Sequence, residues 1–143
     1  MTTRIPGYRG EFLWELEIVT RQSMAMAEAI PVGKYDWRPH PKARSFSEVF
    51  VHVGTGNFML LDVIGLPAPI DLYAQLPAEG QQRFLGLMRR NDELLAAVRE
   101  KDAVVVLLKR SLQVVSQFFA QTSDADLNRS LRFFGEDTTV RRV

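Results

Sequence analysis

The chain has no cysteine, and this absence excludes several kinds of chemistry at once. Disulfide bonds, thiolate nucleophiles and cysteine-rich zinc sites all require that side chain. Long apolar runs are missing too, since no stretch reaches the roughly eighteen residues that a membrane-spanning helix needs. The segment Met1–Gly10 lacks the apolar core of a secretory signal. We therefore expect a cytoplasmic protein with no membrane partner.

Charge of one sign is not in excess either. Eighteen Lys and Arg residues face seventeen Asp and Glu residues, so the net charge is only +1. Such a chain has no electrostatic drive toward phosphate backbones, and we expect no nucleic-acid partner. Gly-rich phosphate loops, nucleophile elbows and His-Glu-x-x-His motifs are absent from the sequence. A length of 143 residues is typical of one domain, which we assign to residues 1–143.

Apolar periodicity predicts an all-α fold with helices over residues 10–29, 45–65, 81–100 and 103–122. Pro31 and Gly33 end the first helix. Ser45 and Glu48 have the spacing of a capping box at the start of the second. Residues 66–80 contain three prolines and predict an irregular connection. Asp102 is the expected N-cap of the last helix.

Local patterns leave some choices open. The run 104–108 fits either a helix or a buried strand, and the helical pattern that follows favours the helix. Residues 123–126 predict a turn or a one-turn helix, and residues 131–135 a short extended segment. Thr138 or Thr139 is placed to cap a further helix.

His52 is the main candidate for chemistry. It lies about a quarter turn from the apolar stripe of the second helix, beside the small residue Gly56. A histidine there serves either as a hydrogen-bonded structural residue or as a metal ligand. We expect it to be at least partly buried, between the first three helices. His40, between two prolines, is expected to be a surface residue.

Carboxylates and aromatic residues suggest weaker sites. Asp62 lies about 80° from His52 around the helix and could border the same groove. Trp37 is expected to pack in a loop or stack on Arg38. The remaining acidic candidates are expected to be solvated or capping groups: Glu11, Glu15, Glu17, Asp124, Asp126, Glu136 and Asp137.

Two blocks of sequence resemble the DinB/YfiT-like metalloenzyme family. The first is Ala29-Ile-Pro-Val-Gly-Lys-Tyr-Asp-Trp-Arg-Pro-His-Pro with Arg44-Ser-Phe-Ser-Glu-Val-Phe-Val-His-Val-Gly, and the second begins at Leu131-Arg-Phe-Phe-Gly-Glu-Asp-Thr-Thr. The resemblance implies an up-down four-helix bundle with a long crossover between the second and third helices. It also implies a divalent metal, which is nickel, zinc or iron, with His52 as one ligand. The other two ligands would be a His-x-x-x-His pair on a final helix, and these 143 residues contain no such pair.

Two functions follow from this resemblance. One is a metal-dependent transferase or hydrolase that uses a small-molecule thiol, with an incomplete metal site and no metal held by three protein groups in this chain. The other is a non-catalytic, stress-associated helical scaffold. We expect the bundle's fourth helix to be truncated, so that the faces of residues 12–30 and 107–119 remain partly uncovered. We therefore predict a homodimer that associates through the faces of the first and third helices.

Overall fold

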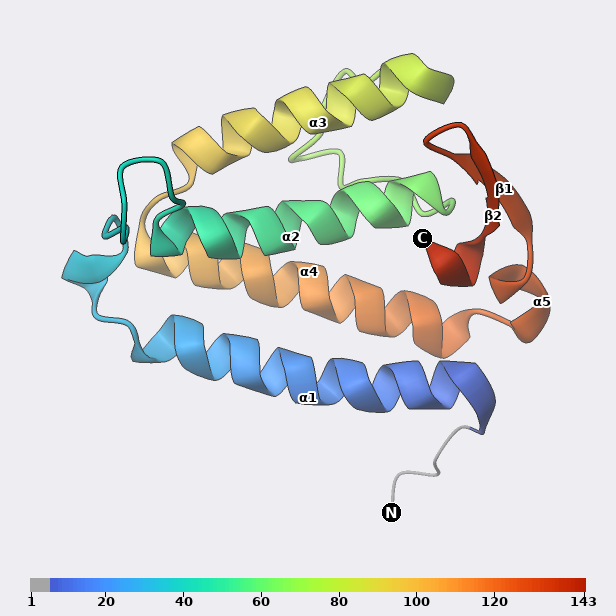
Figure 1. Cartoon of the computed structure of the whole chain (residues 1–143), viewed down its shortest axis with the longest axis horizontal. Helices are drawn as coiled ribbons and strands as arrows, with labels where there is room; N and C mark the ends of the chain where they lie inside the picture. Colours follow the sequence, from blue (N-terminus) through green and yellow to red (C-terminus); the bar gives the residue numbers. More distant parts are fainter. Residues whose placement is uncertain (1–5) are drawn as a thin grey trace.

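The computed structural model describes residues 6–143, and four long helices dominate it (Figure 1). They are α1 (Gly7–Ala29), α2 (Phe46–Val63), α3 (Gly80–Ala97) and α4 (Lys101–Gln121). A 3₁₀ turn, η1 (Val32–Lys34), follows α1. The chain continues after α4 through α5 (Asp124–Leu127), β1 (Ser130–Phe133), β2 (Glu136–Thr139) and the 3₁₀ turn η2 (Val140–Arg142). The mostly helical fold is confirmed.

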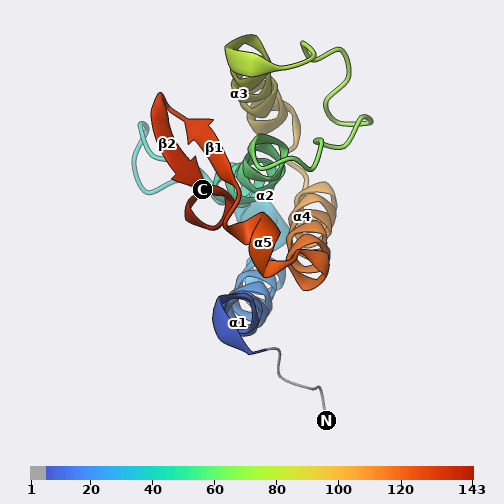
Figure 2. The ribbon, with the colours of Figure 1, turned by 90° about the vertical axis from the view of Figure 1, so that its right-hand side faces the viewer.

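The four helices alternate in direction along one long axis (Figure 1). Helix α4 packs against both α1 and α2, and α3 packs against the other side of α2. Viewed end-on, α1 and α3 therefore lie at opposite ends of the group (Figure 2). The up-down topology and the long connection between α2 and α3 agree with the predicted bundle.

The predicted start of α2 is confirmed at atomic detail. The amide of Glu48 donates to Ser45 Oγ at 3.3 Å, and the Ser45 amide donates to Glu48 Oε2 at 2.7 Å. These two bonds satisfy backbone donors that the first helical turn leaves unpaired. The N-cap of α4 was predicted wrongly, because Glu100 occupies that position. Asp102 lies inside the first turn, where its charge still complements the helix dipole.

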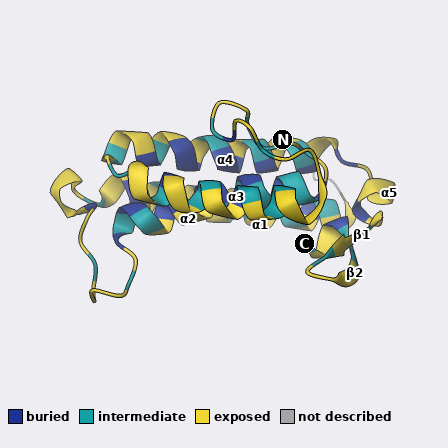
Figure 3. Cartoon of the chain, turned by 90° about the horizontal axis from the view of Figure 1, so that it is seen from above, coloured by how far each residue is buried: buried dark blue, intermediate teal, exposed yellow. Residues whose placement is uncertain are grey.

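The core lies mainly on both sides of α4. One cluster of buried residues joins α1, α2, α3 and α4, and a second joins the far ends of α2 and α4 to the C-terminal elements. Leu107, Leu112 and Phe119 are all buried. The prediction that the face of residues 107–119 remains uncovered is therefore wrong, because α1 and α2 already enclose it. Figure 3 shows the contrast with α3, whose outer side is exposed.

Helix α4 is also long and apolar enough to cross a membrane by length and composition alone. Its packing between α1 and α2 accounts for that composition, since a helix enclosed on two sides needs a wide apolar face. Residues 104–108, which the sequence left open between helix and strand, belong to this helix.

The irregular connection between α2 and α3 is fixed by a buried tyrosine. Tyr73 Oη donates to Asn91 Oδ1 at 2.6 Å, and its ring packs edge-to-face on Phe58. Burial raises the pKa of the Tyr73 phenol, so the group remains a neutral donor. This contact holds the connection against α2 and α3.

The C-terminal elements form a short antiparallel hairpin next to the ends of α2 and α3. Ser130 pairs with Thr139 and Phe133 with Glu136, so Phe134 and Gly135 form a two-residue turn. The extended segment and the one-turn helix after α4 are both confirmed. Thr139 occupies the N-cap position of η2, but its side chain makes no capping hydrogen bond.

Candidate functional site on the open face of α2

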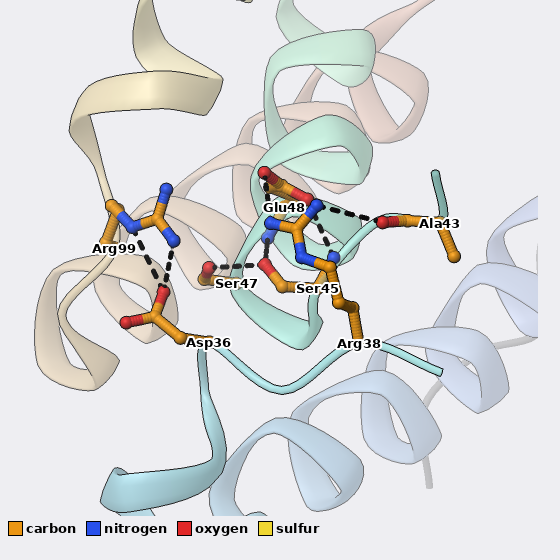
Figure 4. A network of polar contacts seen from close by, with 7 residues as sticks. All are labelled: Asp36, Arg38, Ala43, Ser45, Ser47, Glu48 and Arg99. Atoms are coloured by element: carbon orange, nitrogen blue, oxygen red, sulfur yellow. Dashed lines mark hydrogen bonds and ion pairs between the residues drawn. The ribbon is translucent and has the colours of Figure 1, made fainter. Parts of the chain in front are cut away.

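A polar network fixes the position of α2 at its N-terminal end (Figure 4). Arg38 donates to the Ala43 carbonyl and to Glu48 Oε1, each at 3.0 Å. The pKa of Glu48 is lowered, first by the hydrogen bond from the Ser45 amide and then by the Arg38 guanidinium. Of the two alternatives for Trp37, packing rather than stacking on Arg38 is confirmed, because the Trp37 ring stacks on Phe46 with centroids 5.4 Å apart.

The two sides of α2 have different environments but similar composition. Its buried side, which includes Phe50, Gly54 and Phe58, packs against the neighbouring helices. The opposite side, which we call the open face, consists of residues that are exposed or half-buried: Val49, His52, Val53, Gly56, Leu60 and Val63. A helix that is apolar all round is normally enclosed all round. Among residues 6–143, the open face of α2 is therefore an apolar surface that is exposed at Val49, His52 and Val53 and partly covered at Gly56, Leu60 and Val63.

His52 lies on this open face and is exposed. The prediction that it is at least partly buried is therefore wrong. The exposure of His52 follows from the orientation of α2 about its own axis. Gly54, two residues after His52, faces α4, so His52 faces away from the core. Loss of hydration on the ring's protected side and the charge of Arg44 lower the pKa of His52. Its imidazole is consequently neutral at pH 7.

Asp62 is not brought together with His52. Arg83 on α3 forms a bidentate pair with Asp62, at 2.7 Å to Oδ1 and 2.6 Å to Oδ2, and the Ala68 amide donates to Oδ2 at 2.8 Å. The Asp62 side chain is only 6% exposed. These bonds turn the carboxylate toward α3 and make it part of the fold. Sequence reasoning missed Arg83 because the partners are 21 residues apart.

The other candidates have the places expected of surface and capping groups. His40 is exposed, and its Nδ1 accepts from the Lys42 amide at 3.1 Å. Asp126 forms a capping box with Ser123. The remaining acidic candidates are exposed on α1, α5 and β2: Glu11, Glu15, Glu17, Asp124, Glu136 and Asp137.

The donor set around His52 does not fit a metal centre formed by these residues alone. Over residues 6–143, no group of three His, Asp or Glu side chains is placed to hold a metal ion. Zinc and comparable ions need three or four protein donors. The positive charge of Arg44 also opposes a cation beside His52.

A cleft of about 1310 Å³ lies where the C-terminal end of α2, the first half of α3 and the hairpin meet. Its lining includes Asp62, Arg83, Phe84, Arg132, Phe133 and Phe134. We call it the hairpin cleft. Sequence analysis predicted only the extended segment of the hairpin, since the approach of α3 to this segment depends on the long connection after α2.

Comparison with known protein families identifies a family for this chain. The family model described as the DinB superfamily matches residues 15–143. No curated protein and no solved structure matched the chain.

Proposed function

We propose that this chain, which belongs to the DinB superfamily, acts through residues 6–143 as a helical docking module that forms a homodimer through the open face of α2. The observation that carries this proposal is the apolar character of that face. Val49 and Val53, in the first half of α2, are 42% and 39% exposed, although neighbouring helices cover other sides of this helix. Water contact with such side chains is unfavourable, and association removes it.

Two other helices also carry exposed apolar side chains. Helix α3 packs against one side of α2, and α1 lies beyond α4 (Figures 1 and 2). Their exposed apolar side chains are Val19 and Met26 on α1, and Leu85 and Met88 on α3, where the latter two line the hairpin cleft and are not part of the proposed interface. A second copy presents the same surface, so an isologous pair matches apolar face to apolar face. A net charge of +1 adds little repulsion between the copies.

Sedimentation velocity over a wide protein concentration range tests this proposal, with Val53→Asp as the variant. Two copies would each bury an unpaired carboxylate at the interface, and we expect the dissociation constant to rise by about a hundredfold. Val106→Asp is the matched control, because Val106 is 65% exposed on α4, away from the open face. The proposal fails if the wild type stays monomeric at high micromolar concentration, or if both variants change association equally.

A metal-dependent transferase or hydrolase that uses a small-molecule thiol is the second candidate. The neutral, exposed imidazole of His52 favours it, since such a ring is free to donate its lone pair to a metal. The missing donors would have to come from outside the described residues, so we derive no reaction step here. Metal analysis of purified protein and of His52→Ala tests it. Stoichiometric nickel, zinc or iron that survives dialysis against a chelator, and is lost in His52→Ala, would favour this candidate over the docking module.

We also propose that the protein resides in the cytoplasm, because a chain without cysteine has no need of an oxidising compartment. Fractionation of cells that express the protein tests this, and recovery in an exported fraction would contradict it.

A further inference from the structure

Aromatic side chains form one wall of the hairpin cleft. The ring of Phe84 meets Phe133 and Phe134 edge-to-face, with centroids 5.9 and 5.3 Å apart and interplanar angles of 86° and 85°. Phe133 and Phe134 lie 4.4 Å apart. Because Phe134 remains 76% exposed, much of its ring faces solvent beside the cleft. The cluster can therefore accept a further aromatic ring.

Folding alone does not explain a phenylalanine at position 134. Its φ is +51° and that of Gly135 is +82°, the left-handed geometry of a type I′ hairpin turn. Asn-Gly is the preferred pair in such a turn, and a bulky residue at positive φ is strained. Burial does not offset this strain, because the ring is exposed. Strain of this kind collects at ligand-binding sites.

The charged residues of the cleft leave one cation available on the hairpin. Arg83 is fully engaged by Asp62 and by the Pro77 carbonyl. Arg132 donates through Nε to the Gly135 carbonyl at 3.0 Å. Its terminal N–H groups have no partner within the described part of the chain. Glu79 also lines the cleft, but it is exposed, so solvent screens its charge.

We propose that the hairpin cleft binds a planar aromatic carboxylate. The ligand's ring packs on the Phe84 and Phe134 side of the cleft, and its carboxylate accepts hydrogen bonds from the Arg132 guanidinium. Both anchors come from cleft-lining residues, and Phe134 and Arg132 lie two residues apart on one hairpin. This geometry recognises the combination of a flat apolar ring and an anionic group. The proposal does not depend on dimer formation.

Calorimetric titration with 2-naphthoate and with its neutral amide tests the proposal on the whole chain. We expect saturable binding of the carboxylate, and about tenfold weaker binding of the amide. Arg132→Gln should abolish this preference. Phe134→Asn should weaken binding of both probes by about tenfold. The same variant should raise the unfolding midpoint, because Asn-Gly relieves the strained turn, so that a loss of binding cannot be ascribed to misfolding.

Val53→Asp on the open face of α2 is the matched control and should bind 2-naphthoate as the wild type does. The proposal is overturned by the absence of saturable binding, or by binding that neither Phe134→Asn nor Arg132→Gln changes. It is also overturned if Val53→Asp reduces binding as much as Phe134→Asn does, since the probe would then occupy the open face. These outcomes are distinct from those of the sedimentation test, which reports association alone.

Discussion

Two glycines of α2 provide a direct test of how closely this helix approaches α4. Substitution of a helical glycine by alanine stabilises an exposed helix by about 1 kcal/mol, because alanine loses less backbone entropy. At Gly56, on the open face, a new Cβ meets no atom within 4 Å. At Gly54 the Cβ would overlap Leu107 Cδ2 and lie 3.5 Å from Ser111 Oγ. The two substitutions thus share the same gain in helix stability and differ only in how the new methyl group packs.

The expected difference in stability between the two alanine variants follows from this difference in packing. Leu107 is 6% exposed, so its side chain has little room to move away. Inserting one methyl group into a packed interface costs about 1–3 kcal/mol. We therefore expect Gly56→Ala to stabilise the protein by about 0.5–1 kcal/mol, and Gly54→Ala to be less stable than Gly56→Ala by about 1–3 kcal/mol.

Urea denaturation at a fixed protein concentration measures both variants against the wild type. Equal slopes of unfolding free energy against urea show that the same surface is exposed in each case. Equal stability of the two alanine variants would refute the close approach of α2 and α4 at Gly54. It would also remove the reason for the outward rotation of His52.

Three further predictions concern charged and titratable groups. The pKa of Glu48 is lowered by the Ser45 amide and by Arg38, so its contribution to stability is complete above the ordinary glutamate pKa of about 4.3 and is lost as pH falls through the lower folded value. Glu48→Gln should therefore be less stable than the wild type at pH 7, and this difference in unfolding free energy should shrink as the pH falls below about 4.3. A difference that does not change with pH would contradict this. The pKa of His52 is lowered by reduced hydration and by Arg44, so the folded state should become more stable as pH rises from the folded pKa toward about 6.5. NMR titration of the His52 ring should give a higher pKa in Arg44→Gln than in the wild type. An unchanged pKa would exclude the influence of Arg44. Asp62→Asn should lower the unfolding free energy by about 1–3 kcal/mol, because it weakens the pairing with the partly buried Arg83. Hydrogen exchange at the Ala68 amide should also become faster. Unchanged exchange at Ala68 would show that other contacts hold the connection between α2 and α3.

Local signals predicted the start of α2 and the short helix after α4 well, because neighbouring residues set these two boundaries. Ser45 and Glu48 are three residues apart, and the bonds they exchange fix the start of α2 without help from the rest of the chain. The turn at residues 123–127 follows the same rule through Ser123 and Asp126. Asp102 shows the limit of this reasoning, since a carboxylate is favourable both at an N-cap and in the first turn.

The candidate site was less predictable because its contacts join distant segments. Asp62 and Arg83 meet only after the connection between α2 and α3 has folded back, and Tyr73 must insert between the two helices to hold it there. The aromatic wall of the hairpin cleft likewise joins Phe84 to residues 133 and 134. No local sequence pattern predicts contacts between residues that lie so far apart along the chain.

The orientation of His52 depends on a residue that carries no side chain. Apolar residues lie on both sides of α2, so periodicity alone could not identify the side that packs against α4. Gly54 identifies it, because only a residue without a Cβ allows Leu107 to come so close. Two residues along a helix correspond to a rotation of about 200°. The contact that brings Gly54 against α4 therefore places His52 on the opposite side, in the open apolar face where either proposed function would use it.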